Sequence, residues 1–177
     1  MEKMKAIRQL FKDVLVLEPD TETDDRGTVT ETYSEDDLDS IKIEGVFIEE
    51  KTYRAIKTAT VYGIYFQEDP YLQNKLIYPQ TGSVMVYVIE FDPESDNYLQ
   101  WICVELDSRS NKQIYIPSHY AYCVVTLEPR TNFVVKTDEY NTEGYLRVVT
   151  YLDKTINLEF PYEELVGIYK EKNAPSL

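Results

Sequence analysis

Histidine, the side chain used most often for proton transfer and metal binding near neutral pH, occurs once in this chain, as His119. A single imidazole excludes multi-histidine metal sites and relays that need two imidazoles. The acidic runs at 22–25 and 35–39 offer oxygen ligands, but no EF-hand spacing accompanies them, so we interpret them as solvated charge. No Cys-x-x-Cys pair, P-loop or Gly-x-Gly-x-x-Gly motif occurs either. We therefore expect no metal and no cofactor.

Tyrosine is the chemically capable residue that this chain has in excess, with 16 copies. Phenol rings can stack on a nucleotide base or a sugar. Tyrosines that alternate along strands are more typical of half-buried sheet packing. The two cysteines, Cys103 and Cys123, lie in apolar stretches, and we interpret them as reduced core residues.

The charge balance excludes several classes of partner. With 32 acidic and 18 basic residues the formal net charge is −14, which disfavours binding to nucleic acid and to anionic membranes. A phosphorylated small molecule remains compatible with this charge, provided that a few Arg or Lys side chains converge in one pocket.

The elements that must position these side chains are predicted to be mostly strands. Residues 2–12 place Met4, Ile7, Leu10 and Phe11 at helical spacing, which predicts a short N-terminal helix. About nine or ten short strands follow, and a short helical piece is expected at 162–165. The predicted strands are 14–17, 28–33, 44–48, 59–66, 83–91, 101–106, 113–116, 121–127, 132–137 and 146–151. This spacing favours an all-β sandwich, jelly roll or barrel.

The chain is expected to form one domain, 1–177, with an N-terminal helical extension at 1–12 and a C-terminal tail at 162–177. There is no run of about 18 apolar residues, and the first twenty residues are charged throughout, unlike a signal peptide. We therefore expect no membrane span and a cytoplasmic location.

Short segments in a constant order carry a family resemblance. They are LEP at 17–19 with DRG at 25–27, GIYFQ at 63–67, PYLQNKLI at 70–77, GSVMVYVIEFD at 82–92, KQIYIP at 112–117 and FVVKT at 133–137. Together they resemble the dTDP-4-dehydrorhamnose 3,5-epimerase family over roughly residues 13–177. The resemblance implies a cupin-type jelly roll (a double-stranded β-helix), a homodimer, and a role in deoxysugar and polysaccharide biosynthesis.

The resemblance also implies a ligand and the residues that hold it. The substrate class would be a dTDP- or other NDP-4-keto-6-deoxysugar, which the family epimerises on either side of its C4 ketone. The positions that match the family's substrate contacts are Arg26, Glu31, Gln67 and Lys75.

The same resemblance indicates that the catalytic set has changed. Tyr65 stands where the family has its catalytic histidine, Val135 where it has the acid tyrosine, and Asn173 where it has the supporting aspartate. A second pocket histidine is replaced by Tyr122, and the arginine that helps to hold the diphosphate is replaced by Tyr62.

Whether a tyrosine can replace the base depends on its surroundings. A phenol titrates near 10, so reaching the phenolate at pH 7 costs about 4 kcal/mol unless a nearby cation lowers that cost. One hypothesis is an epimerase or isomerase in which Tyr65 with Lys75 is the base and Tyr122 the acid. The alternatives are a non-catalytic cupin that binds a nucleotide sugar or a partner protein, and a structural jelly roll whose pocket the tyrosines close. For His119, three residues before Tyr122, we expect a structural or surface role.

Overall fold

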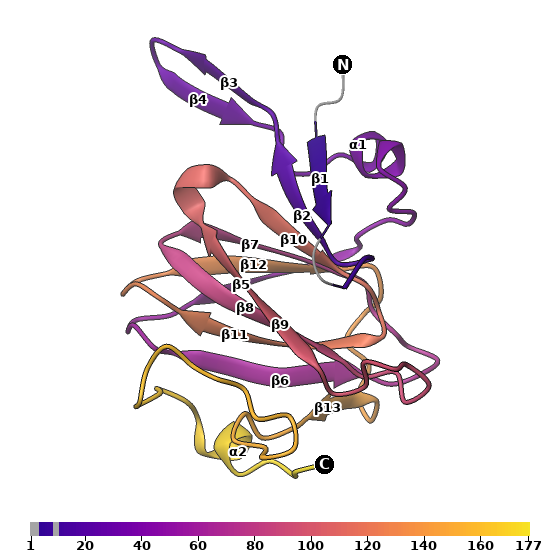
Figure 1. Ribbon diagram of the computed structural model, residues 1–177. Helices are drawn as coiled ribbons and strands as arrows, with labels where there is room; N and C mark the ends of the chain where they lie inside the picture. Colours follow the sequence, from indigo (N-terminus) through magenta and orange to yellow (C-terminus); the bar gives the residue numbers. More distant parts are fainter. Residues whose placement is uncertain (1–3, 9–10) are drawn as a thin grey trace.

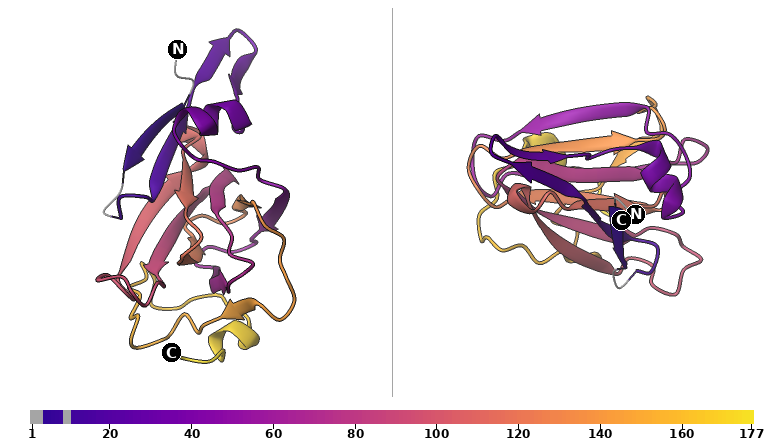
Figure 2. Two further views of the ribbon diagram at one scale, coloured as in Figure 1. Left: turned by 90° about the vertical axis from the view of Figure 1, so that its right-hand side faces the viewer. Right: turned by 90° about the horizontal axis from the view of Figure 1, so that it is seen from above.

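Two facing antiparallel β-sheets make up most of this computed structural model, which describes residues 4–8 and 11–177 (Figures 1 and 2). The six-stranded sheet has the order β1-β2-β10-β7-β12-β5 and the five-stranded sheet the order β13-β6-β11-β8-β9. Strands β3 and β4 pair only with each other, as a hairpin that projects from one end of the molecule (Figure 1). This is the cupin-type jelly roll expected from the sequence.

The strands are β1 Met4–Arg8, β2 Leu15–Pro19, β3 Thr21–Asp24, β4 Gly27–Thr30, β5 Glu49–Arg54, β6 Val61–Gln67, β7 Lys75–Thr81, β8 Ser83–Glu90, β9 Trp101–Asp107, β10 Gln113–Ile116, β11 Tyr120–Thr126, β12 Asn132–Thr137 and β13 Leu146–Val148. The helices are α1 Glu35–Ser40 and α2 Tyr169–Lys172. In the described part of the chain, no helix is long and apolar enough to span a membrane.

The period-two pattern of β8 explains how both faces of its sheet are buried. Val84, Val86 and Val88 point into the core between the two sheets. Tyr87 and Ile89 point to the other face, where they pack beneath the C-terminal segment around Val149–Ile156. Because both faces are covered, the central strands of this sheet form a rigid wall on one side of the space between the sheets.

The N-terminal prediction is wrong where the structure describes it. Met4–Arg8 is the strand β1, paired antiparallel with β2, and not a helix. On a strand, residues three apart face opposite ways, so Met4 is buried (1% exposed) while Ile7 is 45% exposed. Pairing with β2 satisfies the backbone and overrides the helical pattern. Residues 2, 3, 9 and 10 of the predicted helix lie outside the described residues, and 11–12 form a bend and turn.

Three further elements differ from the prediction made from the sequence. The short helical piece expected at 162–165 is absent, and the helix lies instead at α2. The strand expected at 44–48 is displaced to β5, a charged edge strand that lacks the apolar alternation of a buried one. The prediction omitted β7, since Lys75 and Pro79 interrupt its apolar residues.

Cys123 is buried as expected, but Cys103 is exposed, and both are free thiols.

Candidate functional site

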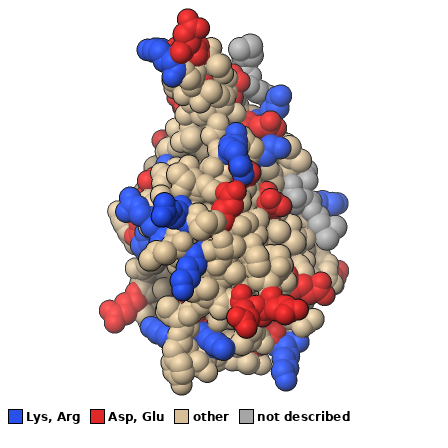
Figure 3. Space-filling view, turned by 90° about the vertical axis from the view of Figure 1, so that its left-hand side faces the viewer, with Lys and Arg blue, Asp and Glu red and all other residues tan. Residues whose placement is uncertain are grey.

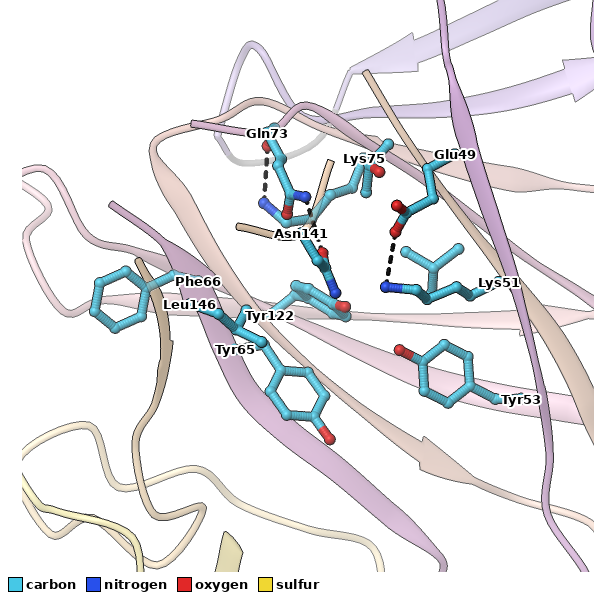
Figure 4. A pocket seen from close by; sticks show the side chains of 12 residues that line it. Glu49, Lys51, Tyr53, Tyr65, Phe66, Gln73, Lys75, Tyr122, Asn141 and Leu146 are labelled. Atoms are coloured by element: carbon cyan, nitrogen blue, oxygen red, sulfur yellow. Dashed lines mark hydrogen bonds and ion pairs between the residues drawn. The ribbon is translucent and has the colours of Figure 1, made fainter. Parts of the chain in front are cut away.

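A cavity of about 200 Å³ opens between the two sheets (Figure 4). Strands β5, β7 and β12 of the six-stranded sheet supply one side, and β6 and β11 of the five-stranded sheet supply the other. Its lining consists of Glu49, Lys51, Tyr53, Tyr65, Phe66, Gln73, Lys75, Tyr122, Val135, Thr137, Asn141 and Leu146. All three residues predicted to be catalytic, Tyr65, Lys75 and Tyr122, are among them. The tyrosines therefore leave the space between the sheets open.

Lys75 is a buried cation in this cavity. It begins β7, is 1% exposed, and its ammonium donates a hydrogen bond of 2.8 Å to the carbonyl oxygen of Gln73. The ammonium also lies 5.6 Å from the centre of the Tyr122 ring. Burial lowers the pKa of Lys75 from 10.5 to about 8, and the nearby Asp138 carboxylate opposes that shift. A cation in such a site can stabilise an oxygen that gains negative charge.

The two candidate tyrosines meet edge to face. Tyr65 on β6 is paired in register with Tyr122 on β11, and their ring centres are 5.6 Å apart. Burial raises the pKa of both hydroxyls well above the usual value of a phenol. Both phenols are therefore neutral at pH 7. Although Tyr65 and Lys75 line the same cavity, the hydrogen-bond partner of the Tyr65 hydroxyl is a carboxylate and not Lys75.

That carboxylate is Glu171, which the sequence analysis missed. It lies on α2, is only 8% exposed, and accepts a hydrogen bond from the Tyr65 hydroxyl on Oε1. The other oxygen, Oε2, accepts a longer bond of 3.4 Å from the backbone N–H of Gly63. Asn173, the position that the resemblance aligned with the supporting aspartate, is exposed and bonds the carbonyl of Tyr169. The sequence signal that could have identified Glu171 is that it is a second carboxylate of the C-terminal tail, two residues before Asn173.

A second lysine lines the cavity from the edge strand β5. The Lys51 ammonium forms an ion pair of 2.7 Å with Glu49, and its side chain is 43% exposed. Lys and Arg side chains also lie together on parts of the surface despite the net charge of −14 (Figure 3). An anionic group could therefore approach Lys51 from solvent.

Comparisons with known proteins agree with this geometry. The family model for dTDP-4-dehydrorhamnose 3,5-epimerase matches residues 8–177. The chain belongs to this family. The dTDP-4-dehydrorhamnose 3,5-epimerase of Salmonella typhimurium is 27% identical over 175 residues, which cover 98% of this chain and 96% of the relative.

Solved structures of the family share the fold over nearly the whole chain. The epimerase of Bacillus anthracis, solved with TDP and PPi bound, has a TM-score of 0.94 at 28% identity, covering 98% of this chain and 99% of its own. The enzyme of Legionella pneumophila, in complex with dTDP-4-keto-L-rhamnose, has a TM-score of 0.90 at 22% identity, covering 97% of this chain and 91% of its own. The family of dTDP-sugar 3,5-epimerases acts in deoxysugar biosynthesis.

Two of the predicted substrate contacts lie away from the cavity of their own chain. Arg26 is in the turn of the β3–β4 hairpin, where it is 86% exposed at its side chain and forms an ion pair of 2.5 Å with Asp24. Glu31 follows the same hairpin and is also exposed. Neither lines the cavity, and the hairpin projects away from the two sheets (Figure 1).

Gln67, the third predicted substrate contact, is buried, and its side chain holds a loop by hydrogen bonds. Its amide nitrogen donates to the carbonyls of Tyr71 (2.6 Å) and Tyr140 (2.9 Å). Its amide oxygen accepts a bond of 2.8 Å from the N–H of Thr142. These bonds hold the 140–142 segment, which carries the lining residue Asn141, next to the cavity.

Two further positions have structural partners. Tyr62, in the family's arginine position, packs its ring 5.2 Å from that of Tyr53 and 5.4 Å from that of Phe133. His119 Nε2 lies 3.2 Å from a carboxylate oxygen of Asp13, and His119 does not line the cavity. Within the described residues, no three His, Cys, Asp or Glu side chains gather as metal ligands.

Proposed function

We propose that this protein is a sugar-nucleotide epimerase or isomerase that moves a proton next to the C4 ketone of a dTDP- or other NDP-linked 4-keto-6-deoxyhexose. The observation that carries the proposal is the meeting of the buried Lys75 with Tyr65 and Tyr122 in one cavity. A ketone acidifies the neighbouring C–H bond, and removal of that proton places negative charge on the ketone oxygen. The Lys75 ammonium is the group suited to hold that oxygen.

The size of the cavity favours a ligand that is only partly enclosed. A volume of about 200 Å³ is below the range of roughly 300–1,000 Å³ that pockets for drug-sized ligands occupy. We infer that the hexose enters and that the nucleotide diphosphate stays at the opening, near Lys51. The TDP and PPi bound by the Bacillus anthracis relative support this ligand class.

A homodimer is part of the proposal. Because Arg26 and Glu31 lie on a hairpin that projects from its own sheets, a contact with substrate would have to be made in a second copy of the chain. We expect sedimentation equilibrium to give twice the chain mass of 20.8 kDa. A monomer at micromolar concentration would overturn this part. The cytoplasm, where nucleotide sugars are available, is the proposed location.

The main alternative is a cupin that binds a nucleotide sugar or a partner protein without turnover. The raised pKa of both phenols favours it, because neither hydroxyl forms a phenolate near pH 7. The two functions make different predictions for the fate of the sugar's own hydrogens.

A proton NMR time course in D₂O with dTDP-4-keto-6-deoxyglucose separates these functions. The proposed enzyme exchanges H3 or H5 of the sugar faster than a sample without protein, and Tyr65→Phe loses this exchange. Broadened ligand signals without exchange would support the binder instead. If neither exchange nor broadening appears, both functions are wrong for this ligand.

Replacing Lys51 with glutamine should weaken the binding of dTDP about fivefold. A charged hydrogen bond to phosphate is worth roughly 1.5–3 kcal/mol, and part of it is offset by the loss of the Glu49 pair on binding. Titration calorimetry at two salt concentrations measures the change, with Lys154→Gln at an exposed site outside the cavity as the control. Equal affinities for both variants would show that Lys51 does not contact the diphosphate.

A further inference from the structure

The contact between Tyr65 and Glu171 joins a cavity residue to a carboxylate behind it. The Tyr65 ring lines the cavity, and its hydroxyl points away from Gln73 and Lys75 (Figure 4). That hydroxyl donates to Glu171 Oε1, while Gly63 N–H holds Oε2. Glu171 itself does not line the cavity. It can therefore act on a substrate only through Tyr65.

We propose that Glu171 takes up the Tyr65 proton during the reaction, so that Tyr65 removes the substrate proton without first becoming a phenolate. The proposal rests on the proposed function and adds a positioning residue to it.

The surroundings of Glu171 show why Tyr65 cannot simply lose its proton to water. The titratable groups that face the carboxylate are Tyr53, Tyr62, Tyr65, Tyr122, Cys123 and Tyr151. Each is neutral at pH 7, because burial raises the pKa of each. Even a normal phenol is ionised to only about one part in a thousand at pH 7. The Tyr65 hydroxyl points toward Glu171 and away from the Lys75 ammonium (Figure 4), so a phenolate there would place a second negative charge directly beside the carboxylate.

A proton relay avoids the second charge. As the C–H bond next to the ketone breaks, its proton bonds to the Tyr65 oxygen and the original Tyr65 proton moves to Glu171 Oε1. The electron pair of the C–H bond becomes the enolate, whose oxygen is held by the Lys75 ammonium. Glu171 becomes neutral as the enolate becomes negative, so the net charge of the site is constant. The reverse transfer returns a proton to the same face of the carbon. Inversion needs a proton from the opposite face, the role assigned to Tyr122, after which Glu171 releases its proton to solvent and Tyr122 takes one up.

Two hydrogen bonds from Thr150 hold the end of α2 and the residues after it, and so help to keep the carboxylate in place for this transfer. The Thr150 hydroxyl donates 2.8 Å to the carbonyl of Lys172, and the Thr150 N–H donates 3.1 Å to the carbonyl of Pro175. Both acceptors follow Glu171 in the sequence, and both bonds come from Thr150, next to the cavity-lining strand β13.

The test uses Glu171→Gln, which keeps the size of the side chain and an oxygen that accepts from Tyr65 but cannot take up a proton. We expect exchange of the sugar protons in D₂O to slow by about 100-fold or more. Glu171→Asp should restore part of the rate, and Glu163→Gln, at an exposed carboxylate of the same tail, should leave it unchanged. Thermal unfolding of each variant confirms that it is folded.

The pH dependence of exchange gives a readout that a purely structural role would not change. Between pH 6 and pH 7, where Lys75 keeps its proton, we expect the wild-type rate to be flat, because no phenolate has to form. In Glu171→Gln the phenolate becomes the base, and the rate should rise about tenfold per pH unit over the same range.

Three outcomes would count against these conclusions, and they are distinguishable. If the wild-type protein exchanges no sugar proton, the proposed function is wrong. If it exchanges and Glu171→Gln is equally fast, the function stands and the relay is wrong. If the wild-type rate itself rises tenfold per unit, a free phenolate is the base and the relay is wrong.

Discussion

Lys75→Met should slow exchange of the 4-keto sugar protons by about 100- to 1,000-fold, the range found when one group that stabilises a developing oxyanion is removed. The Lys75 ammonium is buried and lies in the cavity with both candidate tyrosines. Its pKa of about 8 also predicts the pH at which the effect disappears. The wild-type rate should fall as pH rises through about 8, because the ammonium is lost, while the rate of Lys75→Met should show no such fall. The same NMR time course, run from pH 6 to pH 9.5, measures both.

The pH dependence of the free energy of unfolding provides a control for Lys75→Met that does not depend on activity. The folded-state pKa of Lys75 is lowered, so between pH 8 and 10.5 the unfolded chain binds more protons than the folded one. Relative to Lys75→Met, the wild-type protein should therefore gain stability as pH rises through that window, by on the order of 3 kcal/mol. Urea unfolding at pH 7.5 and pH 10 measures the difference. A variant that keeps full exchange activity would remove Lys75 from the mechanism.

Gly63→Ala should destabilise the fold by about 3 kcal/mol or more. Gly63 has a φ of +107°, and a Cβ there would lie 2.8 Å from the carbonyl oxygen of Tyr122 and 3.3 Å from the Cα of Cys123. Both are backbone atoms of the paired strand β11, so neither can move without disturbing the sheet. The same shift would displace the Gly63 N–H from Glu171.

Gly144→Ala is the matched control for that prediction. Gly144 also has a positive φ, +87°, but a Cβ there meets no atom within 4 Å. Its cost should be limited to backbone strain, roughly 1 kcal/mol. Chemical denaturation of the two variants separates the clash from the strain. Equal losses would show that the approach of β6 to β11 at Gly63 is not tight.

Strands with an apolar run or a clear alternation were predicted well, whereas β1, β5 and β7 were not. The alternation in β8 places Val84, Val86 and Val88 on one face, and the structure shows that this face lies in the core between the sheets. The edge strands β1 and β5 depend on pairing with a neighbour, which no local pattern reports. For β1, two apolar residues at helical spacing supported the wrong element.

The candidate site was predictable to the extent that its residues lie on regular strands. Tyr65, Lys75 and Tyr122 line one cavity, as their alignment with the family implies. Glu171 was not predictable in this way, because it reaches the cavity wall from a four-residue helix 106 positions from Tyr65. The placement of Arg26 and Glu31 depends on the β3–β4 hairpin, which pairs with neither of the two large sheets.

Because Glu171 lies on α2, its contact with Tyr65 can be lost under conditions in which the sheets are still folded. The helix begins at the exposed Tyr169, after the exposed Ile168, and its contacts with the sheets are few beside the long ladder between β8 and β11. Local opening of a short terminal segment requires much less free energy than global unfolding. Each such opening would uncouple Glu171 from Tyr65 while leaving the cavity intact. We therefore expect the relay to be the first part of the molecule to fail on warming, well before the sheets melt.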